Sequence, residues 1–126
     1  MCGIIGYTGY DNAVPYLISG LQRLEYRGYD SSGIALSSDS GIRVIKSQGR
    51  ISELINKISS HENVFSGTGI GHTRWATHGK PSDINAHPHT SCGGFFAVVH
   101  NGIIENYAEI KKELIKCGCT FKSETD

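Results

Sequence analysis

The amino-acid sequence predicts a mixed α/β domain, and three observations support this prediction. Short apolar runs, the pattern of buried strands, alternate along the chain with segments whose apolar residues recur at helical spacing. Glycine, asparagine and aspartate separate these segments, as turns and helix ends require. The chain has 126 residues, of which 38% are hydrophobic and 19% charged, so it can bury a modest core of its own.

The first 75 residues contain strand patterns and helix patterns in alternation. Residues 3–9 are apolar and rich in glycine, which predicts a buried strand at the N-terminus. Asn12 can cap the helix that follows, and Gly28 can end it. The other predicted elements are strands at residues 33–37 and 42–46 joined by a turn at 38–41, a helix at 51–58, and a strand at 67–75.

After residue 75 the sequence predicts a long loop and three further elements. Residues 76–94 are rich in Pro, His, Ser, Thr and Asn, and a loop of this length is usually functional or disordered. Residues 95–100 predict a buried strand, which a sharp turn at Asn101 ends. The remaining elements are a helix at residues 105–117, with Tyr107, Ile110 and Leu114 facing inward, and a strand at 120–122.

The composition argues against several classes of partner. Lys and Arg number 12, as do Asp and Glu, so the chain has no net charge to attract nucleic acid or an anionic membrane. No apolar run reaches the roughly 20 residues that span a bilayer. The N-terminus lacks the basic and apolar regions of a secretory signal, so we expect a cytoplasmic protein. The four cysteines form no C-x-x-C pair and predict neither a zinc ribbon nor a redox motif.

Cys2 is placed to act as an N-terminal nucleophile. Once Met1 is removed, the thiol and the α-amino group belong to the same residue; a retained Met1 would block that amine. An α-amino group has an ordinary pKa of about 7.7–8.0, so it can take the thiol proton and later return it to a leaving group. A lone cysteine at this position is otherwise a small buried residue, and the flanking sequence decides between the two interpretations.

Four stretches together resemble the glutaminase domain of class II glutamine amidotransferases, in the version found in glucosamine-6-phosphate synthase. They occur in the family's order and cover the whole chain. The first stretch alone is a weak signal, whereas all four at matching spacing are a strong one. The stretches are CGIIG at residues 2–6, RLEYRGYDSSG at 23–33, HTRWATHGKPSDINAHPH at 72–89 and HNGIIENY at 100–107.

The resemblance implies an α+β fold, a four-layer α/β/β/α sandwich of the N-terminal nucleophile hydrolase type, which is incomplete here. Residues 1–126 correspond to the N-terminal part of a type 2 glutamine amidotransferase domain. In the family, further strands of that domain and a sugar-phosphate isomerase domain follow, and this chain does not contain them. A sandwich without its later strands exposes sheet edges and apolar faces, so we expect self-association.

The resemblance assigns the chemistry to Cys2, Asn101 and Gly102. Cys2 attacks the side-chain amide of glutamine, and the Asn101 amide and the Gly102 N–H stabilise the oxyanion, which needs preorganised donors. Arg27 and Gly28 lie beside the cysteine in the family and shape its pocket. No metal or organic cofactor takes part in glutamine hydrolysis. The ammonia passes to the isomerase domain, where fructose 6-phosphate becomes glucosamine 6-phosphate.

Further residues bind the substrate glutamine in the family. Arg74 suits the α-carboxylate because a guanidinium can pair with a carboxylate through two parallel hydrogen bonds. Thr77 and His78 support the same end of the ligand, and Trp75 shields the site and helps to route ammonia. Asp126 accepts a hydrogen bond from the α-ammonium. Because Asp126 is the last residue of this chain, we expect it to fray and to hold that group poorly.

Two other interpretations stay open at this point. If the missing strands are needed to close the pocket, the chain is an inactive fragment or a self-associating structural module. A histidine-rich metal-binding module is the other interpretation, because several histidines are crowded in one stretch, although zinc sites usually show clearer ligand spacing. These histidines are His72, His78, His87 and His89.

Overall fold

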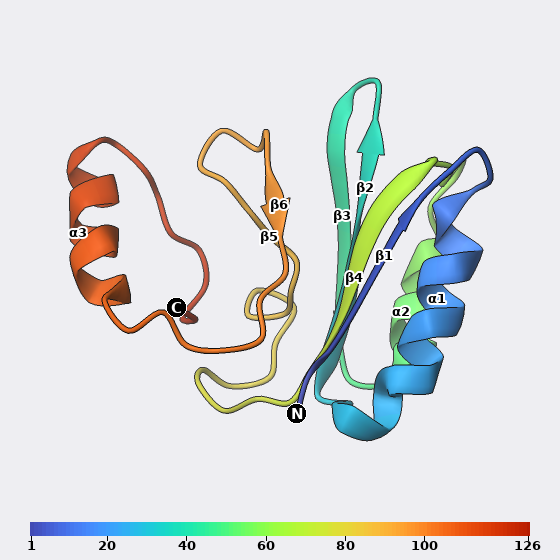
Figure 1. Cartoon of the computed structure of the whole chain (residues 1–126), viewed down its shortest axis with the longest axis horizontal. Helices are drawn as coiled ribbons and strands as arrows, with labels where there is room; N and C mark the ends of the chain where they lie inside the picture. The colour runs from blue at the N-terminus through green and yellow to red at the C-terminus, as the bar shows by residue number, and fades with distance from the viewer.

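The computed structural model describes all residues from 1 to 126 and arranges the elements in four successive layers (Figure 1). Two helices cover one face of a four-stranded sheet, a short hairpin lies on the other side of that sheet, and a third helix lies beyond the hairpin. None of the helices is both long enough and apolar enough to cross a membrane. The helices are α1 (Ala13–Leu24), α2 (Ile51–Ser59) and α3 (Tyr107–Lys116), and the hairpin is β5 (His89–Thr90) with β6 (Ala97–Val98).

The four-stranded sheet is antiparallel throughout and has the order β1-β4-β2-β3. Strand β4 therefore pairs on one side with β1 and on the other with β2. In this register Gly3 lies opposite Thr73, so the N-terminal residues reach the end of β4. The strands are β1 (Gly3–Thr8), β2 (Ser31–Ser38), β3 (Gly41–Gln48) and β4 (Thr68–Arg74).

The hydrophobic core lies between the sheet and its two helices. Leu17 and Leu21 of α1, Leu54 of α2 and Ile34 of β2 have no exposed surface. Burying a side chain of this size stabilises the fold by roughly 1.5–3 kcal/mol. Gly71 of β4 makes room for α1, because a Cβ there would lie 3.1 Å from the Leu21 Cδ1 atom.

The structure confirms the predicted elements of the first 75 residues, with ends that move by one or two residues. The Asn12 side chain caps α1 by accepting a hydrogen bond from the Val14 N–H at 3.3 Å. Helix α1 ends at Leu24, and one 3₁₀ turn (Glu25–Arg27) follows it before Gly28. The predicted stop at Gly28 therefore belongs to this short turn.

The long loop that follows β4 is tied to the sheet. The Asp83 carboxylate accepts a hydrogen bond from the Gln48 N–H at 2.6 Å and also pairs with the Lys57 ammonium, which lowers the pKa of Asp83. The Lys46 ammonium donates to the Ile84 carbonyl oxygen at 3.2 Å. These contacts order the loop, so of the two outcomes that its length suggests, disorder does not apply.

Three predictions for the last third of the chain are wrong. Residues 95–100 do not form a buried strand: only Ala97–Val98 pairs, and Phe95 and Phe96 are 81% and 75% exposed. Helix α3 buries none of its residues. Residues 120–122 form no strand. The physical reason is common to all three, since the second sheet has only two strands of two residues and offers no surface to pack against.

Candidate active site

Cys2 lies against the peptide that follows β4. The Trp75 N–H donates a hydrogen bond to the Cys2 Sγ atom at 3.3 Å, and the Trp75 carbonyl oxygen lies 3.8 Å from the same sulfur. The Cys2 side chain is half-buried, and the Trp75 indole is 44% exposed beside Tyr29. The Trp75 backbone and the Cys2 thiol are therefore in direct contact.

Gly28 sets how closely this peptide approaches Cys2. Gly28 is buried, and a Cβ on it would lie 2.8 Å from the Arg74 carbonyl carbon and 2.9 Å from the Trp75 nitrogen. Any larger residue would therefore push away the peptide whose N–H reaches the thiol. The neighbouring Arg27 donates a hydrogen bond to the Met1 Sδ atom at 3.7 Å, so both residues lie beside the N-terminus.

The Asn101 side chain reaches Cys2 from the opposite layer. Its amide nitrogen donates to the Cys2 carbonyl oxygen at 3.1 Å, across 99 positions of sequence. The next residue, Gly102, has φ +151°, a backbone conformation that side-chain-bearing residues rarely adopt. The Gly102 N–H donates no hydrogen bond within the chain. Cys2, Trp75, Asn101 and Gly102 thus form one cluster from three separate segments.

Arg74 is the buried cation nearest to this cluster. It is 5% exposed, and its Nη2 atom donates to the His78 carbonyl oxygen and, at 3.1 Å, to the Gly79 carbonyl oxygen. The Nη1 atom is buried and has no hydrogen-bond partner. Thr77 and the His78 imidazole are exposed. A buried guanidinium with one unpaired nitrogen is an unsatisfied donor, which an anionic ligand would satisfy.

Hydrogen bonds connect the terminal residues to the rest of the chain, and the fraying of Asp126 stays a prediction. The Asp126 Oδ2 atom accepts a hydrogen bond from the Ile104 N–H at 2.6 Å. The Glu124 N–H donates to Asn85 Oδ1 at 2.9 Å, and the Thr125 hydroxyl lies 3.2 Å from His89 Nε2. The Asp126 carboxylate is therefore anchored at Ile104, two residues after Gly102. Its Oδ1 atom is free to accept from another donor.

The rings of three of the crowded histidines are in contact with one another. The His72 and His87 centroids are 4.3 Å apart with planes 28° from parallel, and His89 meets His87 edge-on at 4.5 Å. Burial lowers the pKa of all three, to about 3 for His87 and about 4 for His89. No group of three His, Cys, Asp or Glu side chains is placed to hold a metal ion, so the metal-module interpretation gains no support.

The sequence interpretation gave His72 no role in the glutaminase site, yet the structure joins it to that site. His72 has no exposed surface, and its Nε2 atom lies 2.7 Å from the Asn101 Oδ1 atom. The available signal was its position two residues before Arg74 in a strand, which places both side chains on one face of the sheet.

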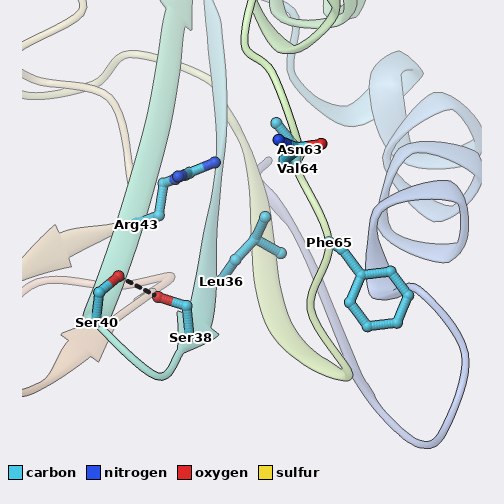
Figure 2. Close-up of a pocket in the computed structure, with 7 residues that line it drawn as sticks. All are labelled: Leu36, Ser38, Ser40, Arg43, Asn63, Val64 and Phe65. Carbon is cyan, nitrogen blue, oxygen red and sulfur yellow. Dashed lines mark hydrogen bonds between the residues drawn. The ribbon is translucent and has the colours of Figure 1, made fainter.

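The pocket drawn in Figure 2 lies elsewhere. It is a cavity of about 70 Å³ at the turn of the β2–β3 hairpin, bordered by Leu36, Arg43 and Phe65 among others. Ligand pockets usually measure about 300–1,000 Å³. None of the residues that line it belongs to the Cys2 cluster, so we assign it no function.

Curated relatives match over the whole chain. The glutamine–fructose-6-phosphate aminotransferase (isomerizing) of Symbiobacterium thermophilum is 61% identical over 128 residues, which cover 100% of this chain and 20% of the relative. The protein of the same name from Aquifex aeolicus is 60% identical over 126 residues, which cover 100% and 21%. The chain thus spans about a fifth of the length of these relatives. No protein-family model matches it.

Solved structures share the fold. Glutamine phosphoribosylpyrophosphate amidotransferase from B. subtilis, complexed with ADP and GMP, superposes with a TM-score of 0.78 at 27% identity, covering 100% of this chain and 27% of that one. The allosteric regulatory enzyme of purine biosynthesis gives 0.79 at 27% identity, covering 98% and 27%. Over its whole length the chain is thus similar to glutamine amidotransferases.

The likeness to these solved structures confirms the predicted fold type. The structural neighbours are amidotransferases of the N-terminal nucleophile type, and the layers of Figure 1 follow the predicted order of helices, sheet, second sheet and helix. The second sheet consists here of the β5–β6 hairpin alone.

Replacing Gly28 tests the contact between the Trp75 peptide and the thiol. Gly28→Ala moves the Trp75 N–H away from Cys2, and losing a hydrogen bond of ~1 kcal/mol should slow alkylation of Cys2 by iodoacetamide roughly fivefold. Peptide mass spectrometry follows Cys2 separately from the other cysteines. Gly6→Ala is the matched control, because a Cβ there meets no atom within 4 Å. Equal rates for both variants would contradict the assignment.

Proposed function

We propose that this chain hydrolyses glutamine to glutamate and ammonia with Cys2 as nucleophile. The observation that carries the proposal is the convergence of donors on Cys2: the Trp75 N–H points at its sulfur, and the Asn101 amide lies against its carbonyl group. After loss of Met1, the α-amino group of Cys2 takes the thiol proton. The thiolate attacks the carboxamide carbon, and a tetrahedral oxyanion forms.

The geometry supports Asn101 and Gly102 as the oxyanion donors. An amide nitrogen carries two hydrogens, and only one of those on Asn101 is used by the Cys2 carbonyl oxygen. The Gly102 N–H is unused as well. When the oxyanion collapses, the C–N bond breaks, the protonated amine returns its proton to the leaving ammonia, and a γ-glutamyl thioester remains. Water then attacks the thioester, which releases glutamate and restores the thiol.

Two charged groups support binding of the amino-acid end of glutamine. The unpaired Nη1 atom of Arg74 can donate to the α-carboxylate, and Oδ1 of Asp126 can accept from the α-ammonium. Thr77 and His78, both exposed beside Arg74, would border the carboxylate. The Trp75 indole is exposed, and because the Trp75 backbone contacts Cys2, the ring would shield the thioester from bulk water.

The relatives' names support a proposal for the use of the ammonia. They are glutamine–fructose-6-phosphate aminotransferases, and this chain spans about a fifth of their length. We propose that the ammonia passes to a sugar-phosphate isomerase domain and becomes the amino group of glucosamine 6-phosphate. None of these steps needs a metal or an organic cofactor, and the proposed location is the cytoplasm.

Removal of the thiol tests the nucleophile directly. Cys2→Ala should abolish glutamine hydrolysis, measured as glutamate release by Met1-processed protein, because no other group on the site can form the thioester. A diazo-ketone analogue of glutamine should label Cys2 alone. Cys117→Ala, which changes an exposed thiol on α3's C-terminal side, should keep both activities. Label on Cys92 or Cys117 in the parent protein would overturn the assignment.

Replacing Arg74 with lysine tests the proposed binding site for the α-carboxylate of glutamine. Arg74→Lys keeps the charge but loses the unpaired Nη1 donor, so KM for glutamine should rise about tenfold to a hundredfold, the cost of one charged hydrogen bond. Steady-state kinetics with glutamine measure it. Arg43→Lys, at the pocket of Figure 2, is the matched control and should leave KM unchanged. An unchanged KM in Arg74→Lys would refute this role.

A second proposal concerns the isolated chain, which we propose self-associates through its exposed apolar side. Phe95, Phe96, Val98 and Ile103 are each more than half exposed on the hairpin and the segment after it. Several large apolar side chains exposed within nine residues of sequence favour association. If association blocks the Cys2 cluster, the isolated chain is inactive although its site residues are intact.

Sedimentation velocity over a range of protein concentrations measures this association. Phe95→Ser combined with Phe96→Ser should shift the chain towards monomer, because both rings are lost from the apolar side. Phe65→Ser, which removes a 66% exposed ring at the far end of the sheet, should leave the association unchanged. A monomeric parent chain at high concentration would contradict the proposal.

A further inference from the structure

Asn101 lies on an exposed stretch of chain, and one buried contact fixes its side chain. Residues 100–106 are all exposed and contain neither helix nor strand. An amide on such a stretch can rotate by half a turn and exchange its oxygen with its nitrogen. With the oxygen towards Cys2, the amide would repel a developing oxyanion. A group that holds the amide therefore controls the fraction of molecules in which the amide nitrogen faces Cys2.

The hydrogen bonds around Asn101 fix which atom faces which partner. The Cys2 carbonyl oxygen only accepts, so the atom 3.1 Å from it must be the amide nitrogen. The amide oxygen then faces His72, whose Nε2 atom lies 2.7 Å away and must carry the hydrogen. His72 is therefore the Nε2-protonated tautomer. Burial lowers its pKa, so the ring stays neutral at ordinary pH.

The His72 ring is itself held by the loop that crosses the sheet. Its face stacks on His87, whose ring centroid is 4.3 Å away. The His87 backbone lies unusually close to β2, because a Cβ on Gly33 would be 2.3 Å from the His87 carbonyl oxygen. Gly33 lies directly opposite His72 in the sheet. Because Gly33 has no side chain, the loop can approach β2 closely enough for the His87 ring to stack on His72.

We infer that His72 is a positioning residue, which holds the Asn101 amide with its nitrogen towards Cys2 and so prepares the oxyanion donor. The inference rests on the proposed function for its catalytic consequence. His72 makes no hydrogen bond to Cys2 itself; it acts through Asn101. It should therefore affect the chemical step and leave the binding of glutamine to Arg74 and Asp126 intact.

Two replacements separate the hydrogen bond from packing. His72→Phe keeps an aromatic ring for the stack and removes the donor, and His72→Gln restores an N–H near the position of Nε2. Removing an oxyanion donor outright costs about 10²–10³ in kcat, so misplacing it in His72→Phe should cost about tenfold or more. KM for glutamine should stay within about twofold, and His72→Gln should recover most of kcat. His61→Phe, an exposed histidine beyond α2, is the matched control.

The outcomes distinguish this inference from the proposed function. If Cys2→Ala is inactive while His72→Phe keeps the parent's kcat, the function stands and the positioning role fails. A His72→Phe loss that His72→Gln does not recover also overturns the role, because it indicates packing alone. The ¹⁵N chemical shifts of the His72 ring, measured on the parent chain, need neither activity nor a variant. An Nε2-protonated ring is expected, and an Nδ1-protonated ring would refute the inference.

Discussion

The pairing of β1 with β4 is the constraint on which the rest of the site depends. Antiparallel register places Gly3 opposite Thr73, and the Gly3 N–H also donates to the Thr73 hydroxyl at 3.1 Å. Cys2 therefore has to lie beside the peptide that leaves β4. A slip of one residue would turn every side chain of β1 to the other face and carry the thiol away from the Trp75 N–H.

The sheet is held in that register by packing on its opposite face. Leu17 and Leu21 of α1 pack on β4, where Gly69 and Gly71 leave the space that these two leucines fill. A side chain at either glycine would meet Leu17 or Leu21 at about 3 Å. The closely packed face of the sheet is thus the one that the helices cover. The proposed chemistry lies at the end of the sheet where β4 stops.

Irregular chain beyond the opposite face of the sheet carries Asn101 and Asp126, whereas His72 and Arg74 belong to β4 itself. The loop after β4 is anchored by Asp83 and Asn85, and the terminal segment is anchored on that loop through Glu124 and Thr125. Asn101 joins this layer to Cys2. Hydrogen bonds made by side chains therefore do here what strand pairing does in the main sheet, and they bring together residues from both ends of the chain.

The sequence by itself determined the local structure of the first 75 residues and the identity of the residues that cluster at Cys2. Apolar spacing and capping act within a few neighbouring residues, so they can be read without knowing the fold. The motifs at Cys2, Arg74 and Asn101 pointed to the amidotransferase family for the same reason. Each motif consists of consecutive residues, so it can be recognised without the fold. The roles of their side chains stay predictions.

Only the tertiary structure decided what lies opposite each side chain. The apolar run at residues 95–100 was compatible with a buried strand, but burial requires a partner surface, and the two-stranded hairpin provides none. The contact between His72 and Asn101 joins residues 29 positions apart, which no local pattern encodes. Hydrogen-bond geometry across layers depends on register and on close approaches such as that at Gly33, and these exist only once the sheet and the loop are packed together.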